Sequence, residues 1–242
     1  MIFLLQFSLI LLIFVCPPIL VNFSDDLAVD FSKFNYFALT SLALALFLFF
    51  QDLRERRLEG TAVQDNKRPL WKAAAFTSNY FLTFGSLAVC GCLFELAGLA
   101  LKTKTFENII FPANFLQGLF CAFALASSAF YEECLYRLYL PKALKKIAAL
   151  TGVDKKSEDK DKLMARPKIA AAAVFWACEA ACVLLFAFAH RYQGPLALLN
   201  ALLAGIILRL SFVKSKSLWP PFFAHLSYNA AALMLARLTL VP

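Results

Sequence analysis

Long uncharged stretches of apolar residues constrain this chain more than any other feature. Ile2–Ile19 and Phe34–Phe50 are two of them. A helix needs about 20 such residues to cross a hydrocarbon core of about 30 Å. The 242 residues are 61% hydrophobic and 17% charged, whereas soluble chains are typically about 45–50% apolar and about 25% charged. The sequence therefore predicts a polytopic helical membrane protein and excludes a soluble enzyme or a nucleic-acid-binding domain.

Seven segments are candidate membrane spans, and together they predict an all-α bundle of about seven transmembrane helices. They are Ile2–Val21, Phe34–Phe50, Ala73–Leu101, Phe115–Leu140, Ile169–His190, Leu196–Phe212 and Phe222–Leu240. Pro17 and Pro18 should kink or end the first span, because proline cannot continue the helical hydrogen bonds. We divide the chain into residues 1–72, with two helices and a basic loop, and 73–242, a membrane core with a charged insert at 147–168.

Lysine and arginine gather in loops on one side of the predicted bundle. If the helices alternate in direction, the stretches 51–72 and 141–168 lie on the same side as Lys214, whereas 22–33 and 102–114 contain few basic residues. Loops rich in Lys and Arg face the cytoplasm. We therefore expect a cytoplasmic N-terminus, an external C-terminus and an integral protein of a bacterial inner membrane.

Some ionisable residues lie within apolar segments, where each costs roughly 2.5–3.5 kcal/mol on insertion scales. Glu133 and Arg137 are four residues apart, so they share a helix face and can form an ion pair. Glu132 is turned by about 100° from Glu133 and has no such local partner. This carboxylate is available as a general base, although a Glu-Glu-Arg cluster at the lipid headgroups is an alternative interpretation.

The two histidines of the chain both lie at ends of apolar segments. His190 follows Phe186 by one turn, and His225 shares a helix face with Asn229. A single histidine near a helix end is usually a structural hydrogen-bonding group, but two of them together with intramembrane Glu132 form a candidate site. A carboxylate and an imidazole can polarise water for attack on a peptide carbonyl, and a second imidazole and an amide can stabilise the oxyanion.

Three motifs, in this order, resemble the CPBP (Abi) family of type II CAAX prenyl endopeptidases and bacteriocin-processing or bacteriocin-immunity proteins. The motifs are Glu132-Glu133-x-x-x-Arg137, Phe186-x-x-x-His190 and His225-x-x-x-Asn229. The resemblance covers roughly residues 73–240. It implies that Glu133 and Arg137 form a supporting ion pair and that Phe186 helps to shape the pocket beside His190. Leu138 departs from the pattern, because members often have Gly after the motif arginine.

The resemblance also implies a glutamate-dependent intramembrane endopeptidase, from a group formerly classed as metalloproteases. Glu132 with His190 would activate the water, and His225 with Asn229 would form the oxyanion hole. No cofactor is expected. A divalent metal such as zinc, with Glu132, His190 and His225 as ligands, is the mechanistic alternative.

Residue counting conflicts with this arrangement. Glu132 and His225 lie near the predicted cytoplasmic ends of their helices, whereas His190 is 22 residues after Lys168 and should lie near the outer face. At about 1.5 Å per residue, this mismatch prevents contact unless the helices are displaced. A protruding start of the fifth span at 170–173, an interfacial first turn of the fourth span, or a recess closed by Gly194-Pro195 would remove the conflict.

The other charged residues within or near the predicted spans are expected to have structural roles. Glu179 should face the bundle interior and pair with another polar group, and Glu95, Arg209 and Arg237 should extend their polar ends toward the membrane surface.

The expected partners of the protein are the lipid bilayer and a membrane-anchored or prenylated polypeptide, such as a CAAX-type tail or a leader peptide, and no nucleic acid. A non-catalytic bacteriocin-immunity or scaffold protein is an alternative. A proton-coupled transporter is a weaker one, because no inverted repeat is visible.

Overall fold

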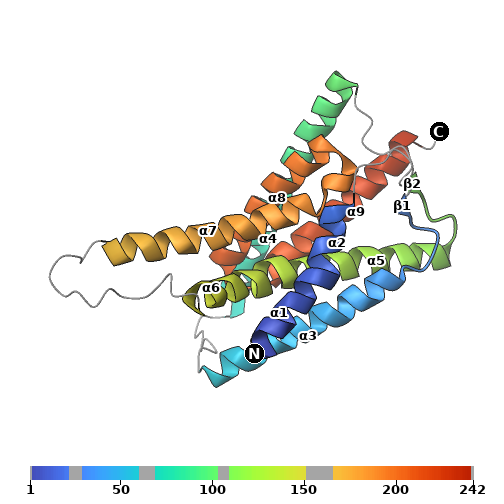
Figure 1. Ribbon diagram of the computed structural model, residues 1–242. Helices are drawn as coiled ribbons and strands as arrows, with labels where there is room; N and C mark the ends of the chain where they lie inside the picture. Colours follow the sequence, from blue (N-terminus) through green and yellow to red (C-terminus); the bar gives the residue numbers. More distant parts are fainter. Residues whose placement is uncertain (1, 22–28, 60–68, 103–108, 151–165, 241–242) are drawn as a thin grey trace.

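The computed structural model describes residues 2–21, 29–59, 69–102, 109–150 and 166–240 and consists almost entirely of helices (Figure 1). The helical elements are α1 (Ile2–Ile10), η1 (Leu11–Val15), α2 (Cys16–Leu20), α3 (Tyr36–Leu58), α4 (Pro69–Leu101), α5 (Phe115–Glu133), η2 (Cys134–Tyr139), α6 (Leu140–Leu150), α7 (Arg166–Phe188), η3 (Arg191–Gln193), α8 (Pro195–Ser215) and α9 (Trp219–Leu240). Two strands, β1 (Val29–Asp30) and β2 (Ile109–Ile110), form a short parallel pair.

The predicted all-α membrane bundle is confirmed. In the described part of the chain, five helices are long and apolar enough to cross a membrane: Ile2–Leu20, Tyr36–Leu58, Lys72–Leu101, Phe115–Leu150 and Pro195–Ser215. The other two long helices are α7, which contains the apolar stretch Ala172–Phe188, and α9, which carries the polar residues His225 and Asn229. Most of the predicted insert at 147–168 lies outside the described residues, and the division at residue 72 stays a prediction.

The helix that begins at Phe115 is longer than predicted. It was expected to end at Leu140, but α5, η2 and α6 continue without a break to Leu150. Its π-helical turn η2 ends two residues before Pro141, and π-turns of this kind occur frequently at functional sites. Because Pro141 has no N–H, the carbonyl of Arg137 loses its usual helical donor. This carbonyl instead accepts a hydrogen bond of 2.9 Å from Nη1 of Arg209 on α8.

The N-terminal helix repeats this arrangement. Its π-turn η1 is followed by Pro17 and Pro18, and the helix ends at Leu20. Since Pro18 cannot donate to the carbonyl of Phe14, this oxygen is free to accept a hydrogen bond of 3.0 Å from the hydroxyl of Tyr131. The prolines therefore leave two helix carbonyls, those of Phe14 and Arg137, free to accept hydrogen bonds from other helices. Both bonds involve residues close to Glu132 in the sequence, Tyr131 and Arg137.

Polar contacts also join α4 to α8 and α9. Asn79 donates to the carbonyl of Ser211 (3.0 Å), and the hydroxyls of Thr83 and Ser211 are 2.8 Å apart. Tyr80 is hydrogen-bonded to Ser227 on α9 (3.0 Å). Between membrane helices such hydrogen bonds replace the hydrophobic driving force that lipid cannot supply. They fix the position of α4 on the face of the bundle formed by α8 and α9.

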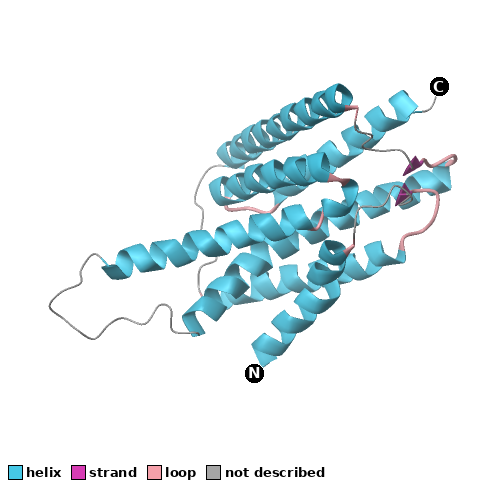
Figure 2. Ribbon diagram, turned by 45° about the horizontal axis from the view of Figure 1, so that its top comes forward, coloured by secondary structure: helices cyan, strands magenta, loops and turns pink. Residues whose placement is uncertain are grey.

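The conflict in depth between His190 and Glu132 disappears because of α7. Figures 1 and 2 show the start of α7 protruding beyond the ends of its neighbours, which is one of the arrangements that would remove the conflict. Glu132 lies at the middle of the 36-residue helix Phe115–Leu150. The end of α7 therefore reaches the level of Glu132, and the turn η3 and Gly194 connect it to α8.

Gly194 makes this turn possible, and we expect its substitution to be destabilising. Its φ of 100° and ψ of 173° lie in a region that only glycine adopts readily. Gly194→Ala should lower the free energy of unfolding by about 1–3 kcal/mol, measured as a lower thermal midpoint in detergent. Gly85→Ala is the matched control, because a Cβ added at Gly85 has no atom within 4 Å. Equal midpoints for the two variants would contradict the role assigned to Gly194.

Candidate functional site

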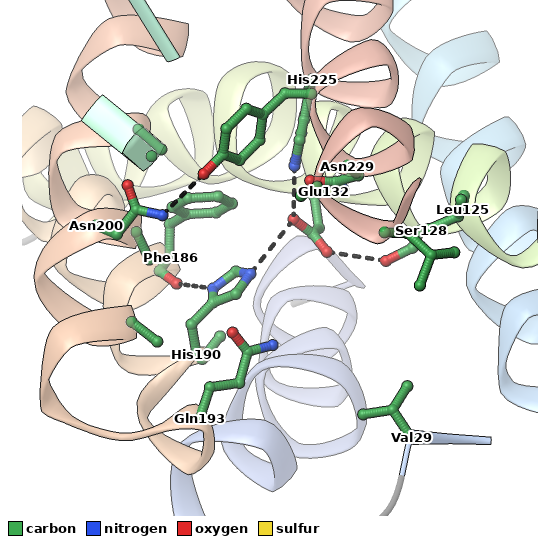
Figure 3. Close-up of a pocket in the computed structure, with 18 of the residues that line it drawn as sticks. Val29, Leu125, Ser128, Glu132, Phe186, His190, Gln193, Asn200, His225 and Asn229 are labelled. Carbon is green, nitrogen blue, oxygen red and sulfur yellow. Dashed lines mark hydrogen bonds and ion pairs between the residues drawn. The ribbon is translucent and has the colours of Figure 1, made fainter. Parts of the chain in front are cut away.

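A pocket of about 470 Å³ lies among α4, α5, α8 and α9 and the end of α7. Its lining includes the four predicted catalytic residues, Glu132, His190, His225 and Asn229, together with Phe186. Figure 3 shows Glu132 between the two imidazole rings. The structure thus brings together residues from α5, α7 and α9 that are far apart in the sequence.

The two carboxylate oxygens of Glu132 have different surroundings. Oε1 accepts a hydrogen bond of 2.9 Å from the hydroxyl of Ser128, one turn earlier on α5. Oε2 is buried and has no hydrogen-bond partner among the described residues. It lies 3.7 Å from Nε2 of His225 and 3.9 Å from Nε2 of His190. These separations exceed direct hydrogen bonds of about 2.7–3.2 Å and suit a bridging water.

His190 lies in the turn that follows α7 and is held in one orientation by the last turn of that helix. Its Nδ1 atom lies 2.8 Å from the carbonyl oxygen of Phe186, and its ring packs against the Phe186 ring with centroids 4.8 Å apart. A carbonyl oxygen only accepts hydrogen bonds, so Nδ1 must carry the proton. Whenever the ring is neutral, its Nε2 lone pair faces the space beside Glu132, which is the arrangement that a proton acceptor needs.

His225 is oriented by Glu133. Nδ1 of His225 lies 3.0 Å from Oε1 of Glu133, whose side chain is fully buried. The predicted ion pair is present, with Nε of Arg137 3.4 Å from Oε2 of Glu133. The Arg137 guanidinium also lies 4.3 Å over the Phe186 ring, a cation–π contact. The sequence indicated the Glu133–Arg137 pair but not that Glu133 would bind His225.

The prediction that Arg209 extends toward the membrane surface is wrong. Its Nη2 and Nε atoms lie 2.8 and 2.5 Å from the carboxylate of Glu179, and Lys145 is 2.7 Å from the same carboxylate. The expectation that Glu179 pairs with a polar group inside the bundle is confirmed. Arg209 remains inside because it finds an acidic partner on α7 and the Arg137 carbonyl on η2. This charge cluster therefore supports the turn that carries Arg137. Glu95 and Arg237 are exposed.

The pocket is also lined by polar residues that the sequence analysis did not predict. Asn200 donates to the hydroxyl of Tyr228 across the pocket (3.0 Å). The Tyr228 ring passes so close to α4 that a Cβ at Gly91 would lie 2.5 Å from its hydroxyl oxygen. In the turn after α7, burial raises the pKa of Tyr192, whose hydroxyl accepts a hydrogen bond from Gln193. Only the Ser128–Glu132 contact could have been read from the sequence, because its spacing is four residues.

The described residues contain no group of three or more His, Cys, Asp or Glu side chains arranged to hold a metal ion. The residues that the zinc alternative names, Glu132, His190 and His225, are of the types that bind zinc. Nδ1 of His225 is held by Glu133 and Nδ1 of His190 by the Phe186 carbonyl, so that both Nε2 atoms are free. Histidines that bind a metal are held in the same way. A zinc ion on these three residues therefore stays the mechanistic alternative to a water that Glu132 and His190 activate directly.

Comparison with known proteins supplies one match. Residues 114–231 match the family model described as Rce1-like, type II CAAX prenyl endopeptidase. This range runs from α5 to the part of α9 that contains His225 and Asn229, and it includes all three motifs. No curated protein and no solved structure matches the chain.

The buried Glu133–Arg137 pair yields a prediction about stability. Arg137→Met leaves the Glu133 charge without its cation, and breaking such a pair typically costs about 3–5 kcal/mol. The double variant Glu133→Gln/Arg137→Met removes both charges and should recover part of that loss. Unfolding of the purified protein in detergent measures both effects. Arg237→Met, at the exposed end of α9, is the control and should change the unfolding free energy by less than about 0.5 kcal/mol. A single variant no less stable than the double would contradict the assignment.

Proposed function

Because residues 114–231 relate this integral membrane protein to the CPBP (Abi) family of CAAX-type proteases, we propose that it is an intramembrane endopeptidase that hydrolyses a peptide bond of a membrane-associated polypeptide. Its proposed nucleophile is a water activated by Glu132 and His190. The observation that carries the proposal is the unpartnered Oε2 of Glu132, which faces the Nε2 atoms of two histidines from two other helices.

Glu132 and His190 are the proposed activating pair. A water between them donates one hydrogen bond to Oε2 of Glu132 and the other to the lone pair on Nε2 of His190. Its oxygen lone pairs then point into the pocket, toward the carbonyl carbon of a bound peptide. As the oxygen attacks, Glu132 accepts the proton. Ser128 fixes Oε1, so that Oε2 keeps its direction during this step.

His225 and Asn229 are the proposed oxyanion hole. They lie one turn apart on α9 and both line the pocket. With Nδ1–H held by Glu133, His225 can donate from Nε2 when the ring carries both protons. The Asn229 amide is a second donor to the oxygen that becomes negative. When the tetrahedral intermediate collapses, Glu132 returns its proton to the leaving nitrogen, which gives an amine and a carboxylic acid.

The decisive experiment compares the terminal peptides of the membrane proteome in the native host with the wild-type protein and with Glu132→Ala, at matched levels. A cleavage product should be present with the wild type and absent with Glu132→Ala, because the variant cannot take the proton of the water. Asn229→Ala should form it about 100–1,000-fold more slowly, as is typical when one oxyanion donor is lost. Glu59→Ala, at the exposed end of α3, is the control and should match the wild type.

Identical terminal peptides for the wild type and Glu132→Ala would contradict proteolysis. They would instead favour a non-catalytic membrane protein of the same fold, such as a bacteriocin-immunity or scaffold protein. Proton flux that is lost in Glu132→Ala, without any change in peptides, would favour a transporter.

Chelation separates the proposed mechanism from its metal-dependent alternative. We expect cleavage by the purified protein to persist after treatment with EDTA and then phenanthroline, because Glu132 and His190 activate the water directly. Zinc added back should have no effect. Cleavage that is abolished by the chelator and restored by zinc would instead support zinc bound by Glu132, His190 and His225.

A further inference from the structure

The pocket extends from Glu132 toward one end of the bundle only. Its outermost lining residues belong to the β1 segment, β2, the last turns of α4 and α9, and the turn before α8. They are Val29, Phe31, Asn35, Glu95, Ile109, Gln193 and Ala236. Figure 3 shows Val29 and Gln193 together on one side of Glu132, and Figure 2 places the strands at the same end of the bundle as the C-terminus.

The opposite end of the pocket is closed by buried side chains. Toward that end the lining stops at Tyr136, Leu208 and His225. Behind them lie residues with little or no exposure, such as Glu133 and Leu140. The charge cluster of Glu179, Arg209 and Lys145 lies beside this layer. The described part of α6 lines no part of the pocket.

The two ends of the bundle also differ in charge. Basic residues around the closed end include Arg54, Arg56, Arg57, Lys72, Lys142, Lys145, Lys146, Lys214 and Lys216. At the open end they are Lys33, Lys102, Arg191 and Arg237. The excess of Lys and Arg marks the cytoplasmic side of a membrane protein. By this rule the closed end faces the cytoplasm and the pocket opens on the other side.

The residues that line the pocket between Glu132 and its open end indicate which chemical groups can bind there. We call this part of the pocket the open arm. Ala197, Ala201 and Ala204 of α8 face the pocket at helical spacing, and Ala232 and Ala236 do so on α9. Their small side chains leave space and offer no charge, so the arm suits apolar groups. The polar groups that meet a peptide carbonyl lie at its inner end, at Glu132 and His225.

We propose that the substrate reaches this site from the extracytoplasmic side, so that the protein acts on an apolar, exported segment of a membrane-anchored polypeptide. The class of substrate rests on the proposed function, whereas the direction of access rests only on the pocket and the charges. The two parts can therefore fail separately.

Cysteine labelling tests the direction of access. The full-length chain, with its seven native cysteines replaced by alanine, receives a single cysteine at one of three positions. Gln193→Cys tests the rim, Ser128→Cys the inner end of the pocket, and Lys214→Cys the basic end. Each variant reacts with a membrane-impermeant cationic methanethiosulfonate, in right-side-out or inverted vesicles. Ala201→Cys replaces Ser128→Cys if the latter does not fold.

We expect Gln193→Cys and Ser128→Cys to be modified in right-side-out vesicles and not in inverted ones, and Lys214→Cys to show the opposite pattern. Modification of Ser128→Cys from the inverted side, or from neither side, overturns the proposal. So does modification of Gln193→Cys in inverted vesicles, because the orientation is then reversed.

The labelling requires no proteolysis, so it separates this inference from the proposed function. External labelling without any cleavage product would retain the direction of access and reject the protease. A cleavage product that depends on Glu132, together with labelling from the basic side, would retain the protease and reject external access. When both succeed, the cleaved bond should lie in an apolar segment on the extracytoplasmic side, and a cytoplasmic cleavage site would reject the substrate class.

Discussion

The buried carboxylate of Glu133 is the interaction on which the rest of the site depends. It contacts His225 of α9 and Arg137 of η2, and Arg137 in turn covers the ring of Phe186 on α7. An unpaired charge at this depth is too costly to retain. The three helices must therefore meet where these partners surround Glu133, and the positions of both histidines follow from that requirement.

Two adjacent glutamates thus have different tasks because they face different directions. Glu133 uses its oxygens to hold the site together, whereas Glu132 uses one oxygen for Ser128 and keeps the other directed at the histidines. The π-turn after Glu133 and the proline that follows it add a second support. They leave the Arg137 carbonyl to Arg209, which is itself fixed by Glu179. Glu133 and Arg137, which position the histidines, are consequently held in place by a second set of charged residues, Arg209 and Glu179.

Sequence reasoning succeeded where the interaction is local and failed where it joins distant segments. The Glu133–Arg137 pair follows from a spacing of four residues, and five of the seven predicted spans follow from apolar length. Arg209 was misplaced because its partner, Glu179, is on another helix. The span predicted to end at Leu140 continues to Leu150, because the helix proceeds through the π-turn and past Pro141. The Asn200–Tyr228 contact gave no local signal, since 28 residues separate the two.

The sequence by itself determined that the chain spans a membrane, which residues could carry chemistry there, and which side holds the basic loops. These properties depend on composition and on spacing within one helix. Only the tertiary structure decided that His190 lies at the level of Glu132 and that the pocket extends from Glu132 toward the end of the bundle that holds β1 and β2. Both depend on how far α7 is displaced along the bundle and on which side chains fill each end. Such offsets between helices are set by packing among distant residues, and no local pattern in the sequence encodes them.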